Sequence, residues 1–306
     1  MTAGPPPTGP PPTGPPPTGL RLWMAGARPR TLGASVAPVL VGTAVASRSG
    51  SVIAWRAGAA LVVAVALQVG VNYANDYSDG VRGVDERRRG PLRLTASGLV
   101  PAAAVKRAAL VAFAVGALAG IVLALAVDWR LILVGAACIL AAGLYSGGPK
   151  PYASAGLGEV AVLVFFGFVA TCGSAFVHHA RLPGLAVAAA LPVGLAACAI
   201  LLANNLRDVE SDRNAGKRTL AVRVGAPAAR GLYAVCVGGA VLCSLALAPF
   251  APGALLALVA APLAVAPVRT VLRPDSDTPA LVGALIATAR FQLVLSVLLA
   301  VGLWNW

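Results

Sequence analysis

The feature that most constrains this chain is a series of long apolar segments separated by short polar ones. They are continuous and rich in Ala, Leu and Gly rather than alternating, which argues against the strands of a membrane barrel. Most reach the roughly 20 apolar residues with which a helix crosses a bilayer. The sequence therefore predicts an all-α membrane protein, a bundle of about nine transmembrane helices. The nine segments lie near residues 31–47, 54–75, 103–127, 131–146, 157–177, 184–206, 229–248, 252–271 and 280–303.

Charge predicts how these helices are oriented. Of the 24 Lys and Arg residues, 19 fall on the side of the N-terminus, four on the opposite side and one, Arg290, inside the last segment. Cytoplasmic loops carry an excess of Lys and Arg, so the N-terminus and the loops on its side are expected in the cytoplasm of a multi-pass cell-membrane protein. The net charge of +13 is explained by this topology, and nucleic-acid binding is not indicated. Arg290 is expected to face the bundle interior or to extend toward an interface.

Residues 1–20 differ in composition from the rest. They repeat GPPPT with a period of five, which is not the period of three found in collagen and is typical of extended polyproline II. We expect residues 1–20 to be a disordered tail, and residues 21–306 to form a single transmembrane domain.

Acidic residues are scarce in this chain and gather at two places. Residues 72–85 read NYANDYSDGVRGVD and residues 204–212 read NNLRDVESD, and with Glu86 these segments hold seven of the 11 acidic residues. Each cluster closes an apolar segment on the predicted cytoplasmic side. Carboxylates are costly near lipid, so their concentration at two such points indicates a functional site.

The spacing within each cluster predicts a shared helical face. Helical continuation places Asn72, Asp76 and Asp79 at i, i+4 and i+7, and it places Asn204, Asp208 and Asp212 at i, i+4 and i+8. Two such faces brought together would offer several carboxylate and amide oxygens. Oxygen ligands suit Mg²⁺, and nothing in the pattern favours zinc.

Basic residues follow each cluster. RRRGPLR occupies residues 87–93 and GKRTLAVR occupies residues 216–223, and a third loop on the same side, YSGGPKPYASAGLGE, carries Lys150 and two tyrosines. Arg and Lys side chains bind phosphate oxygens. A ligand bound by Mg²⁺ and several cations at a membrane surface is most simply a diphosphate on an apolar tail. A polyprenyl diphosphate fits this description.

The motifs resemble those of the UbiA-type intramembrane prenyltransferases, and within them the branch that prenylates 1,4-dihydroxy-2-naphthoate in menaquinone synthesis. The resemblance extends from about residue 23 to the end and rests on NYANDYSDGVRGVD, GPLRLTASG, LYSGGPKPYASAGLGE and NNLRDVESDRNAGKRTLAVRVG. It implies Mg²⁺-dependent transfer of a polyprenyl group from polyprenyl diphosphate to the naphthoate ring with loss of CO₂. The family pattern has three residues after Asp79 before the next aspartate, and here five precede Asp85.

The resemblance also implies roles for individual residues. The catalytic and metal-binding group would be Asp76, Asp79, Asp208 and Asp212, with Asn72 and Asn204 as further metal ligands. The substrate contacts would be Asn72, Arg93, Tyr145, Lys150, Arg207 and Lys217.

Other functions are compatible with parts of this pattern. The same fold could act on another aromatic acceptor, such as 4-hydroxybenzoate or homogentisate. A secondary transporter could use polar residues for ion coupling, but transporters place them near the bilayer midplane, whereas these acids lie at segment ends on one side.

Overall fold

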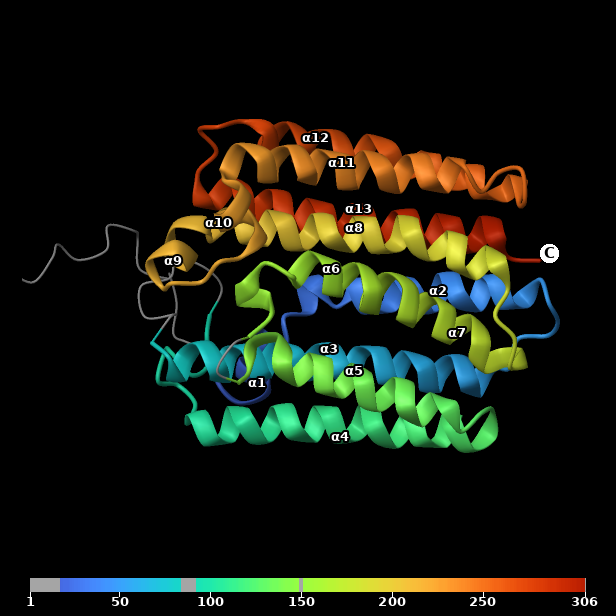
Figure 1. The fold of residues 1–306 in the computed structure, drawn as a ribbon, viewed down its shortest axis with the longest axis horizontal. Helices are drawn as coiled ribbons and strands as arrows, with labels where there is room; N and C mark the ends of the chain where they lie inside the picture. Colours follow the sequence, from blue (N-terminus) through green and yellow to red (C-terminus); the bar gives the residue numbers. More distant parts are fainter. Residues whose placement is uncertain (1–16, 84–91, 149–150, 306) are drawn as a thin grey trace, which may run out of the picture.

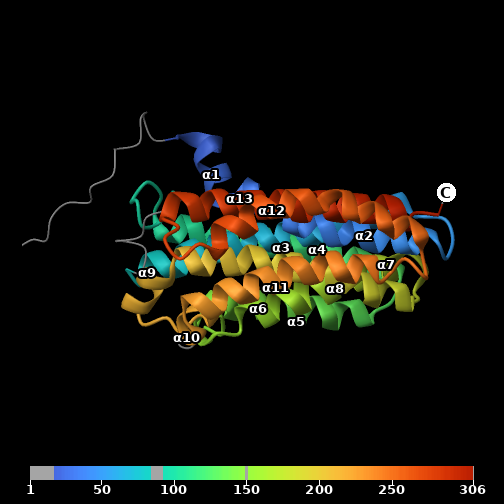
Figure 2. The same cartoon turned by 90° about the horizontal axis from the view of Figure 1, so that it is seen from above.

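The computed structural model describes residues 17–83, 92–148 and 151–305, and every regular element within them is a helix. The long helices run side by side along one direction (Figures 1 and 2). The elements are α1 (Gly19–Ala27), η1 (Pro29–Thr31), α2 (Gly33–Ser47), α3 (Ala54–Val81), α4 (Ala102–Ala126), α5 (Arg130–Ser146), η2 (Ala153–Ala155), α6 (Gly158–Val162), η3 (Leu163–Val169), α7 (Ala170–His179), α8 (Gly184–Arg207), α9 (Val209–Asn214), α10 (Leu220–Val224), α11 (Ala226–Leu245), η4 (Pro252–Ala260), α12 (Ala261–Leu272) and α13 (Thr278–Leu303).

The number of spans agrees with the sequence prediction when the bent pair and the short helix α5 are counted. Among the described residues, seven helical stretches are long and apolar enough to cross a membrane, and the pair α1–η1 and α2, bent by 53°, makes an eighth. The 17-residue α5 is apolar but shorter. It lies along α3 and α4 (Figure 1) and corresponds to the predicted segment near residues 131–146. The predicted count of about nine is therefore a fair approximation.

Helix α8 forms the centre of the bundle. In its most apolar stretch 67% of the residues are buried, against 22% in α3 and α4. Seven of its 15 buried residues are alanine, which lets neighbouring helices approach closely, as is common where helices pack within lipid. Gly194 shows how close: a Cβ there would lie 2.9 Å from the Cα of Gly167 in η3. The outer helices expose many large apolar side chains, which is expected of surfaces that face lipid.

The two ends of the bundle differ in the helix ends and loops that they carry. One end carries the C-terminal ends of α3, α5 and α8 together with α9 and α10, and we call it the motif end. The C-terminus of the chain lies at the opposite end (Figure 1). Residues 1–16 of the predicted tail lie outside the described residues, and Gly19 and Leu20 belong to α1.

Arg290 does not face the interior of the bundle. It lies in the middle of α13 and is exposed on the outer surface. Of the two expectations for this residue, the interior position is therefore wrong. The inward positions of α13 are taken by apolar and small polar side chains such as Phe291, Leu295 and Ser296, which are fully buried.

Candidate functional site

The first acidic cluster lies on the last three turns of α3, as the helical spacing predicts. Asn72, Asp76 and Asp79 are all buried. Asn72 donates from Nδ2 to the carbonyl of Ala27 at 2.8 Å, and its Oδ1 accepts from Gln68 at 3.3 Å. This cluster therefore touches the joint between α1 and η1.

Asp76 has partners of a different kind. Its Oδ2 accepts from the backbone N–H of Leu94 and its Oδ1 from that of Thr95, both at 2.8 Å. Both carboxylate oxygens are thus engaged by main-chain amides of the segment that follows the first cluster. Asp85 and Glu86, which complete this cluster in the sequence, lie outside the described residues.

The second cluster is not one continuous helix, contrary to the spacing argument. Helix α8 ends at Arg207, and α9 begins at Val209 after a break at Asp208. Hydrogen bonds nevertheless continue through the break, from the N–H of Asp208 to the carbonyl of Asn204 and from that of Asp212 to Asp208. The Ser211 hydroxyl also donates to the carbonyl of Asp208 at 2.9 Å. Asp208 and Asp212 therefore stay on neighbouring turns although the helix axis is interrupted.

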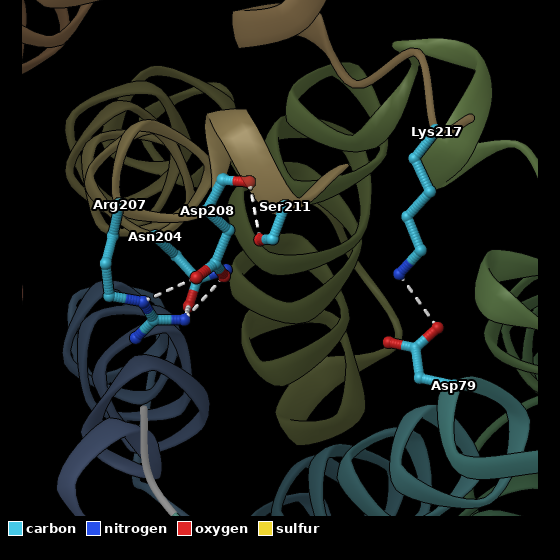
Figure 3. Close-up of polar contacts among 6 residues, drawn as sticks. All are labelled: Asp79, Asn204, Arg207, Asp208, Ser211 and Lys217. Atoms are coloured by element: carbon cyan, nitrogen blue, oxygen red, sulfur yellow. Dashed lines mark hydrogen bonds and ion pairs between the residues drawn. The ribbon is translucent and has the colours of Figure 1, made fainter. Parts of the chain in front are cut away.

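Arg207 holds the polar side chains of this cluster together. Its Nε donates to Asp208 Oδ1 at 2.8 Å, and its Nη2 reaches Asp208 Oδ2 at 2.6 Å and Asn204 Oδ1 at 2.8 Å (Figure 3). The side chains of Arg207 and Asp208 are each only 4% exposed. Buried charges are stable only when they are paired, and this two-armed pair provides that.

A second ion pair joins the two clusters. Lys217 lies three residues beyond α9, and its Nζ donates to Asp79 Oδ1 at 2.8 Å (Figure 3). The loops of the motif end are linked as well. Ser78 donates to the carbonyl of Ser146 at 2.6 Å, and the N–H of Arg218 donates to the carbonyl of Ser154 at 2.8 Å. The structure therefore brings the two motifs and the third loop to one place, as the sequence predicts.

A cavity of about 760 Å³ opens beside these motifs. At the motif end its lining is polar, and beyond that it is apolar and extends between α3, α4, α5, α7 and α8 as far as Leu123 and Val177. Leu123 and Val177 lie near the C-terminal ends of α4 and α7, away from the motif end. The polar residues of the lining are Arg28, Arg30, Thr31, Ser35, Gln68, Asn72, Asn75, Arg93, Tyr145, Tyr152, Ser174, Asn204 and Arg207.

The predicted site residues divide into two groups around this cavity. One group lines it directly: Asn72, Arg93, Tyr145, Asn204 and Arg207. The other group is not part of the lining: Asp76, Asp79, Asp208, Asp212 and Lys217. Lys150 lies outside the described residues.

The sequence argument gave no role to two residues that the structure places at the cavity. Asn75 has a buried Oδ1 with no hydrogen-bond partner among the described residues, and Arg28 has a buried Nη2 in the same condition. Arg28 adopts a left-handed backbone conformation, with φ of +56°, at the joint after α1. Such strain at a non-glycine residue is often found at functional sites. The only sequence signal was the position of Asn75 directly before Asp76.

Tyr145 and Tyr152 border the cavity. Their rings pack edge to face with centroids 5.5 Å apart, and the Tyr152 hydroxyl donates to the carbonyl of Ala141 at 2.9 Å. Burial raises the pKa of Tyr152, which keeps it protonated. Tyr145 lies near the C-terminal end of α5, at the motif end of the cavity.

The chemistry of the donors suits a hard cation, although no cage is preformed. In the described ranges, no three Asp, Glu, His or Cys side chains gather closely enough to hold a metal ion. Asp79 and Asp208 are each neutralised by a cation of the protein. These carboxylates, Asp212 and the unpartnered Asn75 oxygen are all hard ligands of the kind that Mg²⁺ prefers. The residues therefore fit Mg²⁺ if the cations change partners.

Comparison with known proteins gives concordant results. The model of the UbiA prenyltransferase family matches residues 35–282. The 1,4-dihydroxy-2-naphthoate octaprenyltransferase of Mycobacterium tuberculosis (strain ATCC 25618 / H37Rv) is 49% identical over 251 residues, 81% of this chain and 86% of that protein. The protein of the same name from Escherichia coli (strain K12) is 36% identical over 293 residues, 92% of this chain and 94% of that protein.

Solved structures share the fold. A UbiA homolog from Archaeoglobus fulgidus bound to DMAPP and Mg²⁺ has a TM-score of 0.62 at 16% identity, covering 91% of this chain and 99% of its own. The apo UbiA homolog from Aeropyrum pernix K1 has a TM-score of 0.64 at 17% identity, covering 89% and 96%. At these identities the likeness concerns the arrangement of helices alone.

Proposed function

This chain belongs to the UbiA prenyltransferase family, and from that premise we propose that it transfers a polyprenyl group from polyprenyl diphosphate to 1,4-dihydroxy-2-naphthoate with loss of CO₂. The acceptor follows from the relatives named for this reaction. The family assignment leaves no support for the transporter alternative.

The observation that carries the proposal is the division of the cavity. Its polar end lies between two acidic motifs, where a charged head group can bind. Its apolar part continues through the bundle to Leu123 and Val177, where a long hydrocarbon tail can lie. A molecule with a diphosphate at one end and a polyprenyl chain at the other matches both parts.

The metal ligands that we propose are Asp79, Asp208 and Asp212, with Asn75 and Asn204 as amide ligands. When bound, Mg²⁺ supplies positive charge to the diphosphate oxygens as the bond to the prenyl carbon breaks. Asp79 and Asp208 are now held by Lys217 and Arg207. Diphosphate binding would draw these two cations onto phosphate oxygens and leave the carboxylates to the metal.

Further cations complete the diphosphate site. Arg28 and Arg93 line the same end of the cavity as Arg207, and guanidinium groups bind phosphate oxygens in a two-armed manner. Lys150, which lies outside the described residues, is proposed as another contact. Together these residues stabilise the charge that develops on the departing diphosphate.

The reacting carbons lie where the polar lining meets the apolar one. The prenyl C–O bond breaks, a C–C bond forms to the ring carbon that bears the carboxylate, and that group leaves as CO₂ with its electron pair returned to the ring. No net proton is transferred, so the step needs no general base. Tyr145, Phe165 and Phe166 line the cavity, and their ring faces can stabilise the allylic cation while the apolar walls exclude water.

The orientation is also a proposal. The motif end carries most of the Lys and Arg residues of the loops, and we place it in the cytoplasm by the positive-inside rule. A water-soluble naphthoate would then enter from the cytoplasm, whereas the polyprenyl donor comes from the bilayer.

The test mixes purified protein in lipid with 1,4-dihydroxy-2-naphthoate, a polyprenyl diphosphate and Mg²⁺, and follows the products by mass. A prenylated, decarboxylated naphthol that disappears with EDTA is the expected result. Formation of product only with 4-hydroxybenzoate or homogentisate would replace the acceptor and keep the reaction type. Absence of product with every aromatic acceptor would contradict the proposal.

A further inference from the structure

Asp76 differs from the other motif aspartates in what holds its carboxylate. Asp79 and Asp208 are paired with long cationic side chains, which can swing to another partner. Asp76 is 1% exposed, and its two oxygens accept from the consecutive N–H groups of Leu94 and Thr95. Main-chain donors cannot leave unless the segment that carries them is displaced.

The backbone N–H groups of Leu94 and Thr95 each need an acceptor, and a carboxylate supplies both. An ionised carboxyl group offers an acceptor on each oxygen, and hydrogen bonds to a charged acceptor are stronger than neutral ones. An asparagine at position 76 would keep one acceptor and turn an NH₂ group toward the other N–H. One of the two buried amides would then have no acceptor.

The segment that Asp76 holds is packed on both sides. On one side, Gly80 of α3 makes room for it, since a Cβ there would lie 2.5 Å from the Cβ of Thr95. On the other side, the fully buried Leu94 side chain fills the space beside Gly26 of α1, next to Tyr73. The backbone at residues 94 and 95 is therefore fixed between α3 and α1.

Arg93 directly precedes this fixed backbone and lines the polar end of the cavity. The position of its Cα is set by the hydrogen bond one residue later. We propose that Asp76 is a positioning residue, which anchors residues 94 and 95 so that Arg93 is directed at the diphosphate, and that it is not a ligand of the metal. The inference rests on the proposed function, because it takes the ligand of Arg93 to be the donor diphosphate.

The test compares Asp76→Asn with Asp79→Asn, and uses the exposed Glu210→Gln of α9 as the matched acid-to-amide control. Three properties are measured on the full-length protein in lipid nanodiscs. They are Mn²⁺ affinity by electron paramagnetic resonance, affinity for a prenyl thiodiphosphate by calorimetry, and hydrogen exchange of the amides in residues 92–98 by mass spectrometry.

The positioning role predicts a specific pattern. Asp76→Asn should speed amide exchange in residues 92–98 and weaken analogue binding, each about tenfold or more, since leaving a buried amide unpaired is costly. Its Mn²⁺ affinity in the absence of analogue should stay within about twofold of the parent protein. Asp79→Asn should show the reverse, with weaker Mn²⁺ binding and unchanged exchange. Glu210→Gln should change none of the three.

A double variant separates positioning of Arg93 from a general structural effect. In an Arg93→Ala background, Asp76→Asn should cost no further analogue affinity, because the side chain that it positions is gone. An undiminished loss in that background would overturn the inference. So would a loss of Mn²⁺ affinity in Asp76→Asn that equals that of Asp79→Asn.

These readouts distinguish the inference from the proposed function. None requires an acceptor or turnover, and the exchange measurement needs no ligand. If the parent protein failed to bind the prenyl analogue, the proposed function would fail, while faster exchange in Asp76→Asn would still establish the anchor.

Discussion

Arg207 and Asp208 are neighbours in sequence whose side chains turn back on each other, with Nε–Oδ1 and Nη2–Oδ2 distances of 2.8 and 2.6 Å. Arg207 lines the cavity, whereas Asp208 is buried and does not line it. The arginine therefore covers the carboxylate, and the proposed metal ligand becomes available only when the arginine moves to another anion. A diphosphate is such an anion, so donor and metal binding at this site should be mutually dependent.

The first prediction concerns this dependence. Mn²⁺ alone should bind weakly, and a prenyl thiodiphosphate should tighten its binding by about tenfold or more, because the analogue releases Asp208 and Asp79 from their cations and shares the metal. Electron paramagnetic resonance with and without the analogue measures this. By reciprocity the metal should tighten analogue binding by the same factor. Equal Mn²⁺ affinity in both conditions would mean that no exchange of partners takes place.

A second prediction concerns the ion pair between the motifs. The side chains of Lys217 and Asp79 are 17% and 9% exposed, so Lys217→Ala leaves a largely buried carboxylate without its cation. We expect metal-free protein to lose about 1–3 kcal/mol of stability. Thermal unfolding of the protein in detergent should show this as a lower midpoint, and Mg²⁺ should recover part of the loss by replacing the ammonium group.

The control for this prediction exchanges the charges. Asp79→Lys combined with Lys217→Asp should recover stability relative to either single change, yet remain inactive because the carboxylate no longer projects from α3. Activity in the exchanged protein would show that Asp79 does not need its position on the helix.

A third prediction tests the packing at the centre of the bundle. A Cβ at Gly194 would lie 2.7 Å from Cδ1 of Leu163 and 2.9 Å from the Cα of Gly167. Gly194→Ala should therefore destabilise the fold by about 1–3 kcal/mol through overpacking. Gly238 of α11 has no atom within 4 Å of the same position, so Gly238→Ala should be neutral or slightly stabilising. Equal unfolding midpoints for the two variants would contradict the close contact between α8 and η3.

The fourth prediction uses the apolar part of the cavity. Gly173 of α7 lines it, and a Cβ there meets nothing within 4 Å. Gly173→Phe should project a ring from this open position into the cavity and lower the rate with long polyprenyl donors, while a short donor such as geranyl diphosphate serves as the internal control. A competition between long and short donors, followed by mass, measures the ratio. An unchanged ratio would place the tail elsewhere.

The sequence predicts the helices of this protein well, because each span is encoded locally by its own apolar run. The short spans near 31–47 and 131–146 correspond to α2 and α5. The prediction fails at Asp208, where a regular spacing conceals a break between α8 and α9. Spacing alone registers the periodicity of side chains and does not detect an interruption of the helix.

The partners of the site residues could not be predicted, because they depend on tertiary contacts. The spacing of Asp76 and Asp79 makes them equivalent in sequence, yet one holds two backbone amides and the other holds a lysine. The cavity-lining position of Arg28 depends on a left-handed turn between α1 and η1, for which Arg gives no signal. The motifs encode the type of ligand, which is carboxylate and amide oxygen, and they do not encode the partner of each side chain.

The contact between Lys217 and Asp79 has a consequence for how the protein is made. Its two residues are 138 positions apart. At synthesis rates of about 5–20 residues per second, Asp79 waits roughly 7 to 28 s on the ribosome-bound chain before its lysine exists. During that interval Asp79 lacks the ammonium partner that it has in the folded protein. The pair that joins the two motifs therefore forms only after the segments from α3 to α9 have been synthesised.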